Sequence, residues 1–251
     1  MVVKKKNNSS IPVEGSMFLY EKPEYLSHKI HSNLGWRAPD DQYLFAKHVN
    51  SVPIVASEIP SALKFYPIVF PDLDKGGPIA VFNSNNGANP FISDNGVWEK
   101  NTYIPAYLRR YPIATIQGDS DQVAIVVDRS SKGVVEDPEF KFFEDDKLTS
   151  WAQKLVDFSV KYERDLLETN SFMKTLRDLN LLTNKHVGQN LGGKDETFAN
   201  FISIDESTLK TLTDEQILKL NASGYLALIF GQLFSQENWG RIIGKTLPQV
   251  N

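Results

Sequence analysis

The 251-residue sequence contains no cysteine and only four histidines, His28, His31, His48 and His186. The absence of cysteine excludes disulfide bonds, thiolate-bound zinc, iron–sulfur clusters and a cysteine nucleophile. His28 and His31 are three residues apart, but no acidic residue stands at a spacing that would complete a metal site with them. We therefore expect a protein with no bound metal and no cofactor.

Long hydrophobic runs and a marked excess of one charge are also missing. The most apolar stretch, residues 225–230, is far shorter than the ~20 residues that span a bilayer. The net charge is −4, from 27 Lys and Arg against 31 Asp and Glu, whereas general nucleic-acid binders are basic. No apolar segment follows the basic residues 4–6, so no signal peptide is predicted. We expect a soluble cytoplasmic protein that neither binds nucleic acid nor inserts in a membrane; signal-independent export to the cell surface is the alternative.

The distribution of apolar residues predicts an α+β fold. Residues 1–16 have little to bury and are expected to form a mobile leader. Residues 17–251 are expected to form a single domain, in which a mostly antiparallel β-rich half, up to about residue 140, packs with a helical half. Short β-branched and aromatic runs predict strands at 52–56, 65–70, 78–82, 111–116 and 123–127. Pro53, Pro67 and Pro112 indicate strand edges or bulges.

After residue 140 the apolar spacing becomes helical. A stripe from Leu148 to Leu166 predicts one helix, capped by Thr149 or Ser150, and a second helix is expected after Asn170. Residues 183–197 are rich in glycine and asparagine, which predicts a loop. Further helices are expected at 206–212 behind an Asp205 cap, at 214–221 behind a Thr213–Gln216 capping box, and from 225 to about 237 after Gly224.

Catalytic motifs are absent or incomplete. Residues 188–194 fit the Gly-x4-Gly-Lys spacing of a phosphate-binding loop, but Asp195 stands where the loop needs a hydroxyl, and its charge would repel phosphate. Residues 72–77 resemble half of a calcium loop, but they are better interpreted as a turn between strands. No nucleophile elbow and no kinase signature occurs. The sequence therefore predicts no catalytic residue.

The most informative stretch is residues 98–112, which combine aromatic and basic side chains. Such residues suit recognition of a carboxylate, a phosphate or a protein surface. In the alternative interpretation the stretch is a structural turn, and an arginine in it pairs with a carboxylate such as Asp128. The candidate binding residues are Trp98, Tyr103, Tyr107, Arg109, Arg110, Tyr111 and Asp128.

The same stretch resembles a known family. Residues 103–112 (YIPAYLRRYP) are similar to the "Y-[IV]-P-A-Y-L-R-R-Y-P-F" core of the SapC family, with Ile113 in place of the final phenylalanine. Residues 89–98 resemble its "N-L-F-[V]-x-x-x-G-x-W" hairpin, and 123–128 its strand ending in Asp. Residues 65–70, 204–218 and 227–235 also look like family segments. The resemblance covers about residues 34 to 240.

The resemblance implies a role in the biogenesis and secretion of a bacterial surface layer. It implies no catalytic residues, because none are established for the family. Two hypotheses follow. In the first, the protein is a non-enzymatic accessory protein that binds a surface-layer or secretion component, or handles an exported substrate. In the second, it is an enzyme or small-molecule binder for a peptide or metabolite, in which Arg109 and Asp128 line a pocket and Tyr107 or Tyr111 donates a proton. The oligomeric state is left open.

Overall fold

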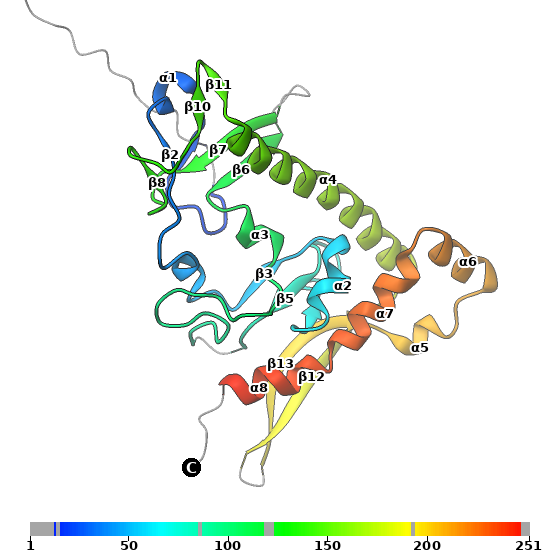
Figure 1. Ribbon diagram of the computed structural model, residues 1–251. Coiled ribbons are helices and arrows are strands. Elements are labelled where there is room, and N and C mark those ends of the chain that lie inside the picture. The colour runs from blue at the N-terminus through cyan, green and yellow to red at the C-terminus, as the bar shows by residue number, and fades with distance from the viewer. Residues whose placement is uncertain (1–12, 14–15, 85–86, 118–122, 192–193, 247–251) are drawn as a thin grey trace, which may run out of the picture. The chain divides into compact units, whose positions relative to one another are not determined.

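The computed structural model describes residues 13, 16–84, 87–117, 123–191 and 194–246 (Figure 1). Contacts between Cα atoms group the chain into two compact units. The first comprises residues 1–45 and 110–163, and the second comprises residues 46–109 and 164–251. Each unit is described by itself. The leader predicted for 1–16 lies almost wholly outside the described residues, and the single domain over 17–251 stays a prediction.

Three small antiparallel sheets form the first unit. The main sheet has the order β1-β7-β6, and its register pairs Pro23 with Asp128 and Ile113 with Val127. Pro112 directly precedes the edge strand β6, as its missing N–H requires. The main sheet consists of β1 (Pro23–Tyr25), β6 (Ile113–Gln117) and β7 (Val123–Asp128). The second sheet, of order β8-β2-β9, consists of β2 (Gly35–Trp36), β8 (Val134–Val135) and β9 (Phe140–Lys141). The third is the pair β10 (Phe143–Glu144) and β11 (Lys147–Leu148).

The core of the first unit lies where β6, β7 and the start of the long helix α4 (Ser150–Asp178) bury their apolar side chains together. The short helix α1 (His28–His31) leads into this core. Two close backbone approaches depend on glycine: a Cβ on Gly133 would lie 2.0 Å from the Trp36 ring, and one on Gly35 would lie 2.1 Å from the Phe140 carbonyl oxygen. The buried core residues are Leu34, Ile113, Val127, Val134, Phe142, Phe143 and Ala152.

A three-stranded antiparallel sheet of order β3-β5-β4 organises the second unit. Pro53 ends an edge strand, and Pro67 directly precedes the other edge strand, so the predicted edge positions of both prolines are confirmed. Asp72 caps the turn after β4, because its Oδ1 accepts the Asp74 and Lys75 amides at 2.8 and 3.2 Å. The elements are β3 (Ser51–Pro53), α2 (Ile59–Ala62), β4 (Ile68–Val69), β5 (Ile79–Val81) and α3 (Ala106–Arg109).

The predicted break at Asn170 is wrong, because α4 is one helix of 29 residues (Figure 1). Polar side chains near the expected break bond back to helix carbonyls instead of ending the helix. Thr169 Oγ1 donates to the Asp165 carbonyl at 2.6 Å, and Ser171 Oγ donates to that of Leu167 at 3.3 Å. The predicted cap is confirmed at Thr149, whose Oγ1 accepts the Ala152 amide at 3.2 Å.

The loop predicted for 183–197 is also wrong. Here β12 (Leu182–Leu191) and β13 (Lys194–Ile204) form a long antiparallel hairpin with a register shift between Val187 and Gly188 (Figure 1). Phe198 and Phe201 pack against Trp239, and Val187 packs against the buried cluster to which Trp239 belongs. This contact is remote in the sequence, so the local glycine and asparagine content gave no sign of it.

The C-terminal helices follow the predicted caps. Asp205 accepts the Ser207 amide at 3.0 Å before α5 (Glu206–Leu209), and Thr213 and Gln216 form the capping box of α6 (Asp214–Ala222). Gly224, with φ of 76°, separates α6 from α7 (Tyr225–Ser235). The last helix, α8 (Asn238–Thr246), was not predicted.

The α+β class is confirmed, with small antiparallel sheets in the N-terminal half and mainly helices in the C-terminal half. Within the described part of the chain, no single helix has both the length and the apolar character that crossing a membrane requires. Among the described residues, only α6 together with residues 225–246 meets the length and composition criteria, and this pair is bent by 90° at its junction.

Candidate functional site

A cavity of about 480 Å³ opens in the first unit, and we call it the aromatic cavity. Four of the side chains that line it are aromatic, and the others are mostly polar or charged. The loop before β1, the segment after β2 and the turn after β7 contribute to the wall. It is lined by Leu19, Tyr20, Glu21, Trp36, Pro39, Asp41, Gln42, Leu44, Phe45, Tyr111, Ser130, Ser131 and Lys132.

Ring contacts build one wall of this cavity. Tyr111 stacks on Phe45 with ring centroids 4.1 Å apart, and the edge of Tyr20 meets Tyr111 at 5.3 Å. Leu19, also in the wall, has a φ of 68°, a left-handed conformation that residues with a Cβ rarely adopt. The rings therefore hold one another in place, and the strained backbone at Leu19 directly precedes one of them, Tyr20.

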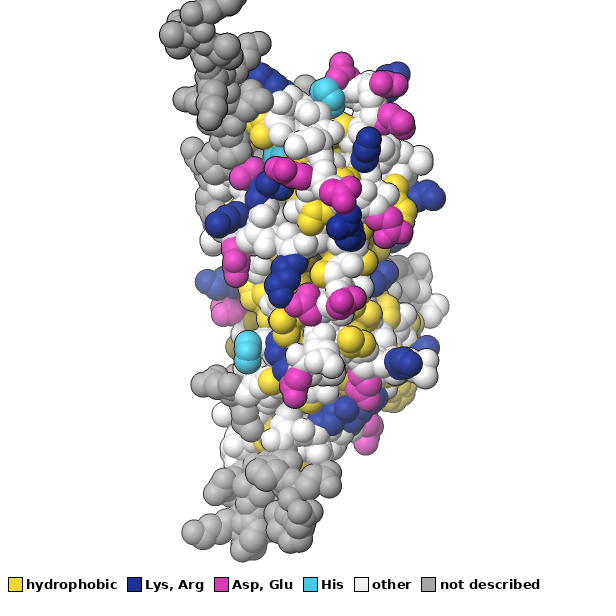
Figure 2. Space-filling model, turned by 60° about the vertical axis from the view of Figure 1, so that its left-hand side comes forward, with side chains coloured by type: hydrophobic (Ala, Val, Ile, Leu, Met, Phe, Trp, Pro, Cys, Tyr) yellow, Lys and Arg dark blue, Asp and Glu magenta, His cyan; other side chains and the backbone are white. Residues whose placement is uncertain are grey.

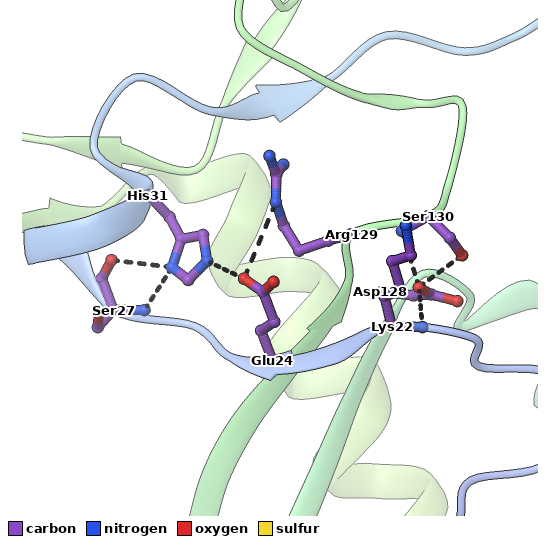
Figure 3. Close-up of polar contacts among 7 residues, drawn as sticks. All are labelled: Lys22, Glu24, Ser27, His31, Asp128, Arg129 and Ser130. Carbon is purple, nitrogen blue, oxygen red and sulfur yellow. Dashed lines mark hydrogen bonds and ion pairs between the residues drawn. The ribbon is translucent and has the colours of Figure 1, made fainter. Parts of the chain in front are cut away.

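Asp128 does not line the aromatic cavity but bonds to residues that do. It is fully buried at the end of β7, where the register brings it beside the chain that enters β1. Its Oδ1 accepts the Lys22 and Ser130 amides at 3.0 and 2.9 Å and the Ser130 hydroxyl at 2.7 Å (Figure 3). Its Oδ2 accepts the Glu21 amide at 2.9 Å and the Tyr111 hydroxyl at 3.2 Å. One carboxylate thus fixes three segments of the cavity wall.

The phenol of Tyr111 is held in its neutral form. Burial, followed by the negative charge of Asp128, raises its pKa to about 12. At neutral pH the hydroxyl therefore keeps its proton and directs it at Asp128. Hydrogen bonds with the Ser131 and Ser130 side chains partly oppose this rise, so Tyr111 is held in place by its neighbours and is not suited to acting as a base.

A second polar cluster lies beside Asp128. The Nε2 of buried His31 is 3.2 Å from Glu24 Oε2, and its Nδ1 receives the Ser27 amide at 3.1 Å (Figure 3). Arg129 Nε lies 3.9 Å from the same Glu24 oxygen. His31 Nδ1 also lies 3.2 Å from the Ser27 carbonyl oxygen. With the proton on Nε2, the ring donates to Glu24 and accepts the Ser27 amide. This cluster ties β1 to α1 and does not line the aromatic cavity.

Charged residues also line the aromatic cavity. Lys132 Nζ pairs with Asp41 Oδ2, and Glu21 lies in the same wall. The lining therefore carries two carboxylates and one ammonium group, with the Asp128 carboxylate behind Tyr111 and Ser130. Among the described residues, no group of three or more His, Asp or Glu could hold a metal ion.

The structure brings together two of the predicted site residues in the first unit, Tyr111 and Asp128. Arg110 has a different partner from the one considered in the structural interpretation. Its Nη1 donates to Glu163 Oε1 at 2.8 Å, and its guanidinium lies 4.4 Å from the centroid of the Tyr162 ring. Since Arg110 is only 6% exposed, we assign it to the core of the unit and not to the cavity.

The other four predicted residues belong to the second unit, where buried Glu58 organises two of them. Glu58 Oε1 accepts the Tyr103 hydroxyl at 2.9 Å and the Ala106 amide at 2.7 Å, while Oε2 accepts the Val55 amide at 2.9 Å. Arg109 donates through Nε to the Ile104 carbonyl at 2.8 Å and through Nη2 to the Tyr103 hydroxyl at 3.1 Å. Burial raises the pKa of Glu58 and that of Tyr103.

Trp98 and Tyr107 are both buried. Trp98 packs against Phe82 and Phe91, and its Nε1 donates to Thr102 Oγ1 at 2.8 Å. The stretch that the sequence marked as a recognition element therefore packs tightly within the second unit up to Arg109. Its role as a binding site stays a prediction.

Alanine variants of the two arginines should differ in stability. Arg110→Ala removes a buried ion pair and a cation–π contact, so we expect its unfolding free energy to fall by about 2–4 kcal/mol. Arg109→Ala changes an exposed side chain and should cost less than about 1 kcal/mol. Chemical denaturation of both variants measures the difference. Equal losses would show that the burial of Arg110 does not determine its contribution.

Most of the cavity residues were missed by the sequence analysis. Asp41 and Lys132 lie in turns, Trp36 ends the two-residue strand β2, and Phe45 lies in a three-residue 3-10 helix, so none of them belongs to an element long enough to show periodicity. The only available signal was the aromatic content of residues 36–45 in a segment without a clear secondary-structure pattern.

The geometry defines an α+β protein with a ligand-sized, aromatic-lined cavity. The chain belongs to the SapC family, whose profile matches residues 26–242. No curated protein and no solved structure was found to match the chain.

Proposed function

We propose that the protein is a non-enzymatic accessory protein that holds part of a partner in the aromatic cavity. The observation that carries this proposal is how the polar groups of the cavity wall are hydrogen-bonded and protonated. The Asp128 carboxylate already accepts five hydrogen bonds, and Tyr111 keeps its proton because its pKa is about 12. General acid or base catalysis is efficient when the pKa of the group lies near the working pH, and the pKa of Tyr111 is far above it. A rigid, preorganised wall is what binding needs.

The partner we propose is a component of surface-layer biogenesis or secretion, or another exported substrate. Membership of the SapC family supports this assignment. The proposed location is the cytoplasm, with signal-independent export to the cell surface as the alternative. Figure 2 shows Lys, Arg, Asp and Glu side chains interspersed on one face, with hydrophobic side chains between them. Such a mixed surface favours a protein partner over a polyanion.

Site-specific photo-crosslinking tests the proposal. A benzophenone amino acid replaces Leu44, which lines the cavity and is 36% exposed, and in a control it replaces Phe140, which is 38% exposed in the same unit. After irradiation of the source cells, we expect an adduct with one surface-layer or secreted protein from position 44 only. The same adducts from both positions, or none from position 44, would refute the cavity as the binding site.

The second candidate, a small-molecule binder or enzyme for a peptide or metabolite, is favoured by the cavity volume of about 480 Å³. This volume lies within the range of ligand pockets. Tyr111→Phe separates the two functions, because it removes the hydroxyl and keeps the ring. A catalytic Tyr111 predicts that turnover is lost in this variant, whereas an accessory protein should retain its crosslink.

A further inference from the structure

We propose that the aromatic cavity recognises a cationic group, a guanidinium or an ammonium. This inference rests on the proposed function and names the chemistry that the cavity selects. The cation is either a basic side chain of the bound partner or a small free amine. Both sources present the same group, and the experiment below distinguishes them.

The first argument comes from the rings. Trp36, Phe45, Tyr20 and Tyr111 all line the cavity, and the Phe45–Tyr111 stack fixes the orientation of two of them. The faces of aromatic rings are electron-rich and attract cations, most strongly where water is excluded.

The second argument comes from the charges. Asp41 and Glu21 line the cavity with Lys132 as the only basic lining residue, and Lys132 is already paired with Asp41. Behind the wall, the fully buried Asp128 is bonded to Tyr111 and Ser130. Of the nearby basic side chains, Arg129 extends toward Glu24, as Figure 3 shows. The two acidic lining residues and the one basic lining residue therefore give the lining a net charge of −1.

Other ligand classes fit less well. A phosphate or carboxylate would be repelled by Asp41 and Glu21 and would have to displace Asp41 from Lys132. A neutral aromatic group could stack on the rings, but it would remove water from the charged groups of the lining and form no ion pair with them. A guanidinium suits both the aromatic rings and the carboxylates of the lining, because it stacks on ring faces and donates hydrogen bonds to a carboxylate in one plane.

Calorimetric titration of the full chain tests this inference. The probes are N-acetyl-arginine amide, the isosteric but neutral N-acetyl-citrulline amide, and butylguanidinium, which lacks a peptide backbone. We expect the arginine probe to bind at least about tenfold more tightly than the citrulline probe. If the arginine probe also binds more tightly than butylguanidinium, the source is a peptide side chain; if the two bind equally well, a small free cation suffices.

Variants locate the binding to the cavity. Asp41→Asn should weaken binding of the arginine probe by about tenfold, and Glu21→Gln should weaken it by a smaller factor. The control is Asp137→Asn, which should leave the affinity unchanged because the Asp137 carboxylate is exposed and paired with Arg37. Equal binding of the citrulline and arginine probes would overturn the inference. No saturable binding of any cation up to about 10 mM would also overturn it. If position 44 still crosslinks in that case, the proposed function stands and only the cation assignment fails.

Discussion

Replacing Asp128 with alanine is expected to lower the unfolding free energy of the protein by about 3–5 kcal/mol. The carboxylate is fully buried and accepts hydrogen bonds from the amides of Glu21, Lys22 and Ser130 and from two hydroxyls. Alanine leaves these donors without their acceptor, and buried donors without partners are costly. The loss should exceed that of any single apolar contact in the cavity wall.

Hydrogen exchange measured by mass spectrometry identifies the affected segment. In Asp128→Ala, peptides that cover residues 20–25 and 128–132 should exchange faster, because three of their amides lose their acceptor. Asp137→Asn is the matched control, since that carboxylate is 97% exposed, and it should behave like the wild type. Unchanged protection at residues 21 and 22 in the alanine variant would contradict the structural role of Asp128.

The second large effect is expected at Glu58. Glu58→Ala should lower the unfolding free energy by about 2–4 kcal/mol, because the Val55 and Ala106 amides and the Tyr103 hydroxyl all donate to this carboxylate. Chemical denaturation measures the loss. Glu215→Gln, at an exposed ion pair with Lys219, is the matched control in the second unit and should stay close to the wild type.

The pH dependence gives an independent test of Glu58. Burial raises its folded-state pKa above the ordinary value of 4.5, so the folded state binds a proton more readily than the unfolded state. The contribution of Glu58 to stability is therefore full below pH 4.5 and is lost as the pH rises through the raised pKa. Relative to Glu58→Gln, the wild type should lose stability as the pH rises from 4.5 through the raised pKa of Glu58. If the stability of the wild type relative to Glu58→Gln rises with pH instead, the predicted direction of the pKa shift is wrong.

Local sequence signals predicted elements well where short-range chemistry determines them. The capping box of Thr213 and Gln216 and the caps at Thr149 and Asp205 are confirmed, because a side chain and the nearby amides suffice to form each one. The edge positions of Pro53 and Pro112 are confirmed because a missing N–H restricts where a strand can pair. The predictions failed at Asn170 and at the β12–β13 hairpin. Near Asn170, hydroxyls that donate to helix carbonyls leave α4 unbroken, and in the hairpin, packing against the cluster that contains Trp239 determines the structure.

The candidate site was predicted only in part. Tyr111 and Asp128 belong to neighbouring strand segments, so their contact follows from pairing β6 with β7. Phe45 reaches Tyr111 from a segment 66 residues earlier, since 111 − 45 = 66. No local pattern indicates such a contact. The partner of Arg110 was missed for the same reason, because Glu163 lies on α4.

The most direct test of the cavity as the functional site is complementation of a strain that lacks the gene. Cells carrying the wild type, Phe45→Ala or Phe140→Ala are compared for the amount of surface-layer or other secreted protein outside the cell. Both rings are stacked on another aromatic side chain, but only Phe45 lines the aromatic cavity. We predict that Phe45→Ala, present at the wild-type level in the cell, fails to restore export and that Phe140→Ala restores it. Full export with Phe45→Ala would contradict the account.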